Sequence, residues 1–101
     1  MSQEDIGDMI ARLWAAQYPV VLGRFAAIDH GIEAITAGAS PADDAVQVAY
    51  REAHNLAGAL GSYGRAEGSV LARELMGALA ETGPDPEALA SLLERIKEAC
   101  S

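Results

Sequence analysis

The chain has 101 residues, a length that predicts one domain spanning residues 1–101 with a core of its own. Half of its residues are hydrophobic, mostly Ala, Leu, Ile and Val, and aromatic residues make up only 5%. Acidic residues outnumber basic residues by 15 to 7, and the formal net charge of −8 repels the phosphate backbone of nucleic acids. We therefore expect an acidic, helical protein, a monomer that does not bind nucleic acid.

The first residues and the cysteine content predict a cytoplasmic protein. The N-terminal sequence Met-Ser-Gln-Glu-Asp is acidic and has neither the basic nor the apolar stretch of a signal peptide. No apolar run approaches the roughly 18 residues that a membrane span needs, so no membrane association is expected. Cys100 is the single cysteine, which excludes an intramolecular disulfide, and we interpret it as an incidental residue near a frayed C-terminus.

The N-terminal third of the chain predicts two helices separated by a proline. The first runs from about Gln3 to Gln17 with Ser2 as its N-cap, because apolar residues recur there at steps of three and four. Tyr18-Pro19 is expected to end it, since proline cannot donate the helical hydrogen bond. The second runs from about Val20 to Ala37 and is ended by Gly38.

Three further helices are predicted in the rest of the chain. Ser40-Pro41 has the form of an N-cap with proline at the first helical position, and it opens a third helix that runs to about Tyr63 or Gly64. A fourth helix is expected from about Ala66 to about Glu81. Asp85-Pro86 then opens the last helix, whose apolar residues are Leu89, Leu92, Leu93, Ile96 and Ala99.

The five segments predict an all-α fold. Four long amphipathic helices with short connections favour an antiparallel four-helix bundle, and no segment shows the period-two alternation of a half-buried strand. The first helix would be an additional short N-terminal helix, which we expect to cap one end of the bundle through Trp14.

His54 is the candidate functional residue of the third helix. The apolar stripe of this helix is formed by Val46, Ala49, Ala53, Leu56 and Leu60. His54 falls about 130° from the centre of that stripe on a helical wheel, so its imidazole is expected to point toward solvent. Because neutral imidazole is a good nucleophile at physiological pH, an exposed histidine on a rigid helix is suited to group transfer.

Two glycines share the predicted face of His54. Gly58 follows it by four residues and Gly61 by seven, and a glycine inside a helix costs about 1 kcal/mol relative to alanine. Two explanations stay open. Either the missing side chains let a bulky partner bring its own active site onto the imidazole, or close packing between helices requires glycine.

These residues resemble the signature of the histidine-containing phosphotransfer (HPt) family. That signature is His-x-Leu-Lys-Gly, then small residues, a glycine, and a following helix with spaced leucines. The matching residues here are His54, Asn55, Leu56, Ala57 and Gly58, followed by Gly61, Gly64, Leu71 and Leu75. The resemblance covers about residues 20–100. It equates His54 with the phosphorylated histidine, Leu56 with the buried leucine behind it, and Gly58 with the glycine that opens the docking face.

The chain departs from the family at one position of the signature. The family has a lysine near the phosphoryl group, three residues after the histidine, where this chain has Ala57. Arg51, one turn before His54, is our candidate for phosphate-side support in its place. The resemblance further implies that Gly58, Gly61, Asn55 and Ala57 belong to the partner-docking surface, although Asn55 is equally well explained as a solvated helix residue.

The resemblance implies a protein that relays a phosphoryl group between receiver-domain aspartates in a two-component phosphorelay, through phosphohistidine at His54. Such a protein is a carrier without catalytic turnover of its own, and its partners are response-regulator receiver domains or a hybrid histidine kinase. It has no metal or other cofactor of its own, because Mg²⁺ is bound by the partner receiver. The alternative is an HPt-like bundle that is not phosphorylated and inhibits a receiver or kinase by binding it, which the Ala57 departure supports.

Other chemistry has less support in the sequence. His30 is also predicted to be exposed, but it lacks glycines four and seven residues later, so we assign it no catalytic role. Neither histidine has the glutamate three residues earlier that bundle metal sites use, and no glycine-rich loop precedes a Lys-Ser or Lys-Thr pair. An enzyme with His54 as general base would need a convergent acid or second nucleophile on the same face, and none is predicted.

Overall fold

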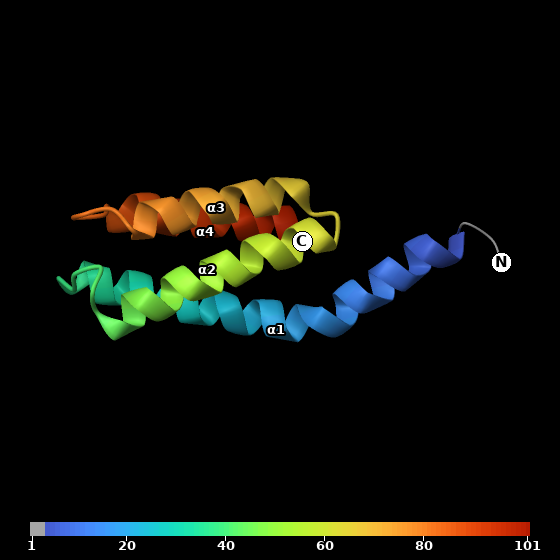
Figure 1. Cartoon of the computed structure of the whole chain (residues 1–101), viewed down its shortest axis with the longest axis horizontal. Helices are drawn as coiled ribbons and strands as arrows, with labels where there is room; N and C mark the ends of the chain where they lie inside the picture. Colours follow the sequence, from blue (N-terminus) through green and yellow to red (C-terminus); the bar gives the residue numbers. More distant parts are fainter. Residues whose placement is uncertain (1–3) are drawn as a thin grey trace.

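The computed structural model of the chain describes residues 4–101, and this range contains four α-helices and no strand (Figure 1). Helix α1 spans Glu4–Thr36, α2 spans Asp44–Ser62, α3 spans Ala66–Leu79 and α4 spans Pro86–Cys100. The all-α fold is therefore as predicted from composition and periodicity. The proposed N-cap Ser2 and the predicted first residue Gln3 lie outside the described residues.

The predicted break at Tyr18-Pro19 is wrong, because α1 is one helix that continues through Pro19. The short N-terminal helix that we expected as a separate element is the first part of α1, and it projects beyond the other three helices (Figure 1). Proline removes one helical hydrogen bond and crowds the preceding turn, but the residues on either side still supply the remaining bonds. Packing of the following turns through Val21 and Phe25 holds that part of α1 against the bundle.

Side-chain caps explain where α2 and α4 begin. Helix α2 starts at Asp44 and not at the predicted Pro41, because the Asp43 carboxylate accepts a hydrogen bond from the Ala45 amide at 3.0 Å and serves as the N-cap. The Ser40 hydroxyl instead accepts a hydrogen bond from the Ala42 amide, in the turn that precedes α2. The start of α4 is as predicted, with Asp85 as N-cap and Pro86 in the first turn.

The core is formed by the apolar stripes of all four helices. Helix α1 packs beside α2 and α4, and α3 likewise packs beside α2 and α4, whereas the backbones of the diagonal pairs in the described range do not come within 8 Å (Cα to Cα) of each other. Four helices therefore surround one core, and the largest fully buried side chains are Ile28, Leu56, Leu60, Leu75, Leu79, Leu89, Leu93, Ile96, Val21 and Val46. The stripe predicted for the His54 helix is buried throughout, and Gly64 follows that helix with a φ of 74°, a value that favours glycine.

Trp14 connects the projecting part of α1 to the bundle. Its ring lies 5.6 Å from the Tyr63 ring in an edge-on arrangement, and the Arg65 guanidinium lies over it at 4.5 Å. Trp14 thus contacts the α2–α3 connection, as expected for a residue at the end of the bundle. Although α1 has 33 residues, neither it nor another helix of the described range has the continuous apolar stretch that a membrane crossing requires.

Candidate functional site

His54 lies inside α2 and its side chain is exposed, as the helical wheel predicts. It forms no hydrogen bond or ion pair with any residue between 4 and 101, so the imidazole is free to react. The backbone behind it is held firmly, because Ala53 and Leu56 on either side are both fully buried. The imidazole is therefore a solvent-facing nucleophile on a helix whose other side is packed in the core.

The edge of α2 that carries His54 faces α3. Ala57 follows His54 by three residues, and its carbonyl accepts a hydrogen bond of 2.7 Å from the buried hydroxyl of Ser69 in α3. A Cβ at Gly61 would lie 3.5 Å from the same hydroxyl. Tyr50 precedes His54 by four residues and lines a cavity whose opposite wall is the end of α3. Residues at these spacings share one side of a helix, so His54 lies along the seam between α2 and α3.

One hydrogen bond and one shared cavity indicate how α2 and α3 are aligned on either side of His54. The Ala57 carbonyl accepts the Ser69 hydrogen bond at one level, and Tyr50 and Ala80 line the same cavity at the other. His54 lies between these two residues of α2, and Arg73 lies between these two residues of α3. Arg73 is also four residues from Ser69 and seven from Ala80, so it shares their side of α3.

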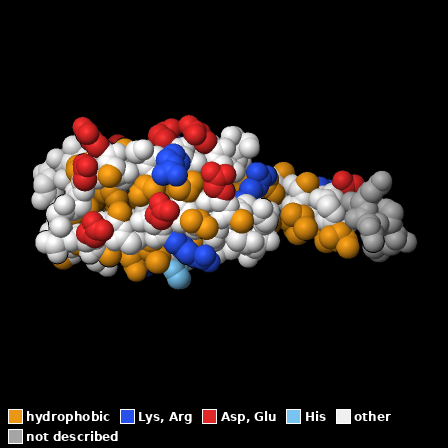
Figure 2. All heavy atoms as spheres, turned by 90° about the horizontal axis from the view of Figure 1, so that it is seen from above, with side chains coloured by type: hydrophobic (Ala, Val, Ile, Leu, Met, Phe, Trp, Pro, Cys, Tyr) orange, Lys and Arg blue, Asp and Glu red, His pale blue; other side chains and the backbone are white. Residues whose placement is uncertain are grey.

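Arg73 and His54 therefore flank the same stretch of the seam, and both side chains are exposed. Figure 2 shows one histidine protruding at an edge of the molecule, next to a Lys or Arg side chain. Sequence analysis missed Arg73 because it lies on a different helix from His54. Its spacing from Ser69 was visible in the sequence, but the pairing of Ser69 with Ala57 was not.

The surroundings of the two glycines bear on the two explanations that the sequence leaves open. A Cβ built at Gly58 has no atom within 4 Å, and one at Gly61 meets only the Ser69 hydroxyl at ordinary contact distance. Alanine would therefore fit at both positions, and close packing does not explain either glycine. Gly7 and Gly23 in α1 are equally open, and nothing in the structure explains them.

Of the other predicted site residues, two are exposed and one is buried. Arg51 and Asn55 are exposed on α2, as a role at the surface requires. Ala57 is 4% exposed and belongs to the core, so the prediction that its side chain contributes to a docking surface is wrong. The physical reason is that a residue three positions after His54 turns toward α3, where the Ser69 hydrogen bond closes the seam.

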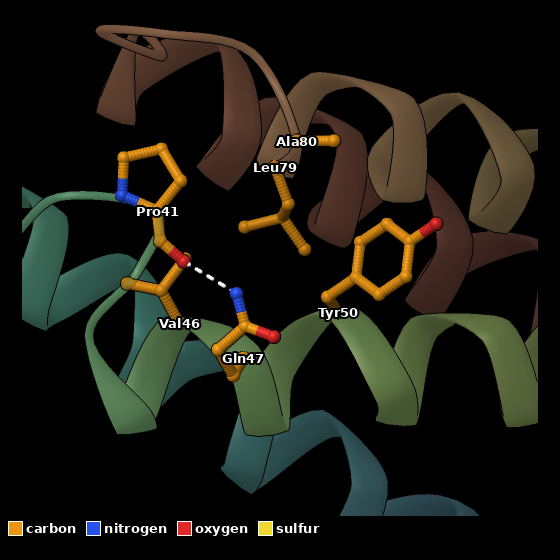
Figure 3. A pocket seen from close by; sticks show the side chains of 6 residues that line it. All are labelled: Pro41, Val46, Gln47, Tyr50, Leu79 and Ala80. Carbon is orange, nitrogen blue, oxygen red and sulfur yellow. Dashed lines mark hydrogen bonds between the residues drawn. The ribbon is translucent and has the colours of Figure 1, made fainter.

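A shallow cavity lies one helical turn from His54 (Figure 3). Its volume is about 200 Å³, and its lining residues are Pro41, Val46, Gln47, Tyr50, Leu79 and Ala80. The Gln47 amide, which Figure 3 shows beside the cavity, is engaged by the Pro41 carbonyl at 2.7 Å. The walls are otherwise carbon-rich and carry no charged group, so the cavity is unsuited to hold a phosphate and is distinct from the reactive position.

Cys100 is better ordered than the sequence suggests. It occupies the last turn of α4 and is 2% exposed, so the interpretation as a residue of a frayed terminus is wrong. Burial raises the pKa of its thiol above the ordinary value of 9.0, and the charge of Arg65 partly offsets that increase. A buried thiol with a raised pKa is a poor nucleophile, so Cys100 is a core residue.

Neither His30 nor an acidic cluster adds a second reactive centre. His30 is exposed on α1 and shares no seam with Arg73. Within residues 4–101, no group of three or more His, Cys, Asp or Glu side chains is arranged to hold a metal ion.

Comparison of the chain with protein-family models, with curated proteins and with solved structures finds no match in any of the three.

Proposed function

We propose that the protein is a histidine phosphotransfer protein that relays a phosphoryl group between receiver-domain aspartates through His54. The observation that carries the proposal is the exposed, unpaired imidazole on the outward side of a packed helix, with open space at Gly58 one turn away. In the part of the chain that the structure describes, no group of three or more His, Cys, Asp or Glu side chains could hold a metal ion beside it. A carrier needs only the nucleophile and a surface on which its partner docks.

The transfer step follows from imidazole chemistry. The lone pair of His54 Nε2 attacks the phosphorus of the receiver's aspartyl phosphate, a P–N bond forms, and the P–O bond to the aspartate breaks so that the aspartate leaves as a carboxylate. The Nδ1 proton stays on the ring, which becomes a phosphoimidazolium. In the reverse step an aspartate carboxylate of a second receiver attacks that phosphorus, and neutral imidazole leaves.

The receiver provides the rest of the chemistry. Its Mg²⁺ compensates the charge of the phosphoryl oxygens, and its aspartate accepts or donates the group. The carrier must therefore let a second protein approach within bonding distance of the imidazole. Gly58 and Gly61 leave the face of α2 open on the C-terminal side of His54, and exposed Asn55 lies within reach of a docked partner.

We also propose that the protein is cytoplasmic and that its four helices run antiparallel. Each helix contacts the next one along the chain, and the connections are short, at residues 37–43, 63–65 and 80–85. Connections of such lengths between long neighbouring helices reverse the chain direction. This order gives α2 a buried side and an outward side along its whole length, which a rigid carrier requires.

A second candidate function is a bundle of the same fold that binds a receiver or histidine kinase without carrying phosphate. The specific observation in its favour is Ala57, which is small and buried where the HPt family has its lysine. Phosphorylation of His54 separates the two candidates, because a pure binding protein has no need of a reactive histidine.

The experiment is phosphorylation of the purified protein by phosphoramidate and by a panel of prephosphorylated receivers. We expect acid-labile, alkali-stable label on His54, located by mass spectrometry, and its loss in His54→Gln. His30→Gln is the matched control, since it removes the other exposed histidine and should keep the label. Absence of label from every donor, with the fold verified by circular dichroism, would contradict the carrier function and favour the binding protein.

Substitution of Gly58 tests the docking face in the same assay. An arginine there places a large side chain one turn from His54, in space that is open in the structure, so folding should be preserved. Gly58→Arg should slow transfer from receivers and leave phosphorylation by the small donor phosphoramidate nearly unchanged. Equal receiver kinetics in the variant and the wild type would show that the partner docks elsewhere.

A further inference from the structure

We propose that Arg73 of α3 is the cation that contacts the phosphoryl group on His54, and that it takes the place of the lysine that the HPt signature has at position 57. This inference rests on the proposed function. It moves phosphate-side support from Arg51, on the helix of the histidine, to the neighbouring helix across the α2–α3 seam.

The first step is the position of Arg73. It lies between Ser69, which bonds to the Ala57 carbonyl of α2, and Ala80, which lines a cavity together with Tyr50 of α2, and this alignment places it level with His54. Packed helices are about 8–10 Å apart between axes, a separation that a long arginine side chain bridges along the surface of the seam. The guanidinium can therefore reach the outer side of the imidazole, where a phosphoryl group on Nε2 would lie.

The second step is the space beside the histidine. Helical side chains lean toward the N-terminus of their own helix, and from Arg73 that direction leads toward Ser69 and hence toward Ala57. Ala57 has only a methyl group, and it is buried. The surface above it is therefore left for the arginine, which brings a positive charge to the part of the seam where a lysine at position 57 would bring its own.

The third step is the pairing of the basic residues. Arg24 forms an ion pair with Glu52 at 2.8 Å, Lys97 forms ion pairs with Asp29 and Glu94, and Arg65 stacks on Trp14. Arg73 forms no ion pair with a side chain of residues 6–101, so its guanidinium has no carboxylate partner in this range.

A free guanidinium suits the charge and shape of a phosphoryl group. Its planar fork of N–H donors matches two phosphoryl oxygens, which a single-point cation or a neutral amide does not. Arg51 is equally free of ion pairs within residues 6–101, but it lies about 120° from Ala57 on the helical wheel of α2, on the side of His54 away from the α2–α3 seam. The geometry therefore favours Arg73 over Arg51.

The test measures the rate at which phosphoramidate phosphorylates His54 in the full chain, as a function of donor concentration. In this reaction a P–N bond to His54 forms, the P–N bond of the donor breaks, and ammonia leaves. Phosphoramidate needs no receiver, so the rate reports the carrier's own residues. We expect Arg73→Gln to lower the second-order rate constant about tenfold, which corresponds to about 1.4 kcal/mol.

Three further variants show whether the effect comes from the charge of Arg73. Arg73→Lys should recover most of the loss. Arg95→Gln is the matched control, because Arg95 is exposed on α4, a helix that makes no contact with α2 in the described range. Arg51→Gln should resemble the wild type. The difference between Arg73→Gln and the wild type should also shrink as salt is added, because salt screens a surface charge but not a packing defect.

The outcomes separate this inference from the proposed function. If wild-type His54 is labelled and Arg73→Gln reacts at the wild-type rate, the inference on Arg73 is overturned and the carrier function stands. If Arg51→Gln is the slow variant, the supporting cation is on α2 and the inference is likewise wrong. If wild-type His54 takes no label from any donor, the proposed function fails first, and a role for Arg73 in phosphate binding fails with it.

Discussion

Gly31 offers the sharpest test of how closely α1 and α2 pack. A Cβ at this position would collide with the Ala49 side chain and come within 2.9 Å of the Ala45 carbonyl oxygen. Both obstacles belong to the α2 backbone or lie next to it, so Gly31→Ala must push two helices apart. Overpacking of this kind costs about 1–3 kcal/mol, and we expect the upper end, about 3 kcal/mol, because no flexible side chain can give way.

The helix propensity of alanine offsets part of this cost. Alanine gains about 1 kcal/mol over glycine in a helix interior, so the expected net loss for Gly31→Ala is about 2 kcal/mol. For a chain of this size that corresponds to a Tm lower by roughly 8–16 °C. Gly23→Ala is the matched control in the same helix, because its Cβ would face open space. It should raise the Tm by roughly 4–8 °C through the propensity term alone.

Thermal unfolding followed by circular dichroism at 222 nm compares the two variants directly. The reasoning predicts Tm changes of opposite sign for substitutions that are chemically identical. A Gly31→Ala protein as stable as Gly23→Ala would refute the close approach of α1 and α2, and with it the position of α2 on which the His54 site depends.

Two further predictions concern Cys100 and the start of α1. Because burial raises the pKa of Cys100, folding stability should be fully present below the ordinary thiol pKa and should fall as the pH rises through the higher pKa of the folded state. Urea denaturation between pH 7 and 10.5 measures this, and a Cys100→Ala protein should lack that part of the pH dependence; an equal decline in both would contradict it. Deletion of residues 1–12 should change the free energy of unfolding by less than about 0.5 kcal/mol, since Ile6, Met9 and Ile10 are 59%, 49% and 43% exposed. A loss well above that value in urea denaturation would show that this segment packs against the bundle in solution.

Much of the fold could be predicted because helices leave a periodic signal in the sequence. The stripe that contains Val46, Leu56 and Leu60 was identified by spacing alone, and all three side chains are fully buried. The start of α4 was identified for a similar reason, since Asp85 and Pro86 form a cap that depends only on neighbours along the chain.

The errors in the fold arose where two local signals competed. Pro19 predicts the end of a helix, but the loss of one hydrogen bond did not outweigh the packing of the turns that follow it in α1. Ser40 and Asp43 are both good N-caps, and the sequence alone did not show that Asp43 caps α2. In each case two signals predict different helix ends, and the periodicity of the sequence does not show which of them is stronger.

In the candidate site, too, features that depend on one helix could be predicted, whereas features that depend on the packing of two helices could not. The exposure of His54 and the buried stripe beside it follow from the wheel of a single helix, and both were predicted. The burial of Ala57 and the proposed proximity of Arg73 to His54 depend on how α2 and α3 align, which the Ser69 hydrogen bond to the Ala57 carbonyl helps to fix.

This dependence on alignment explains why Arg51 was the natural candidate from the sequence. A cation one turn away on the same helix can be found by counting, whereas a cation on the next helix cannot. A surface that binds phosphate needs positive charge at a particular point in space, and it does not matter which helix supplies it. An alanine at the lysine position is therefore compatible with phosphotransfer if a neighbouring helix carries an unpaired arginine at the level of the histidine, which is the role we propose for Arg73.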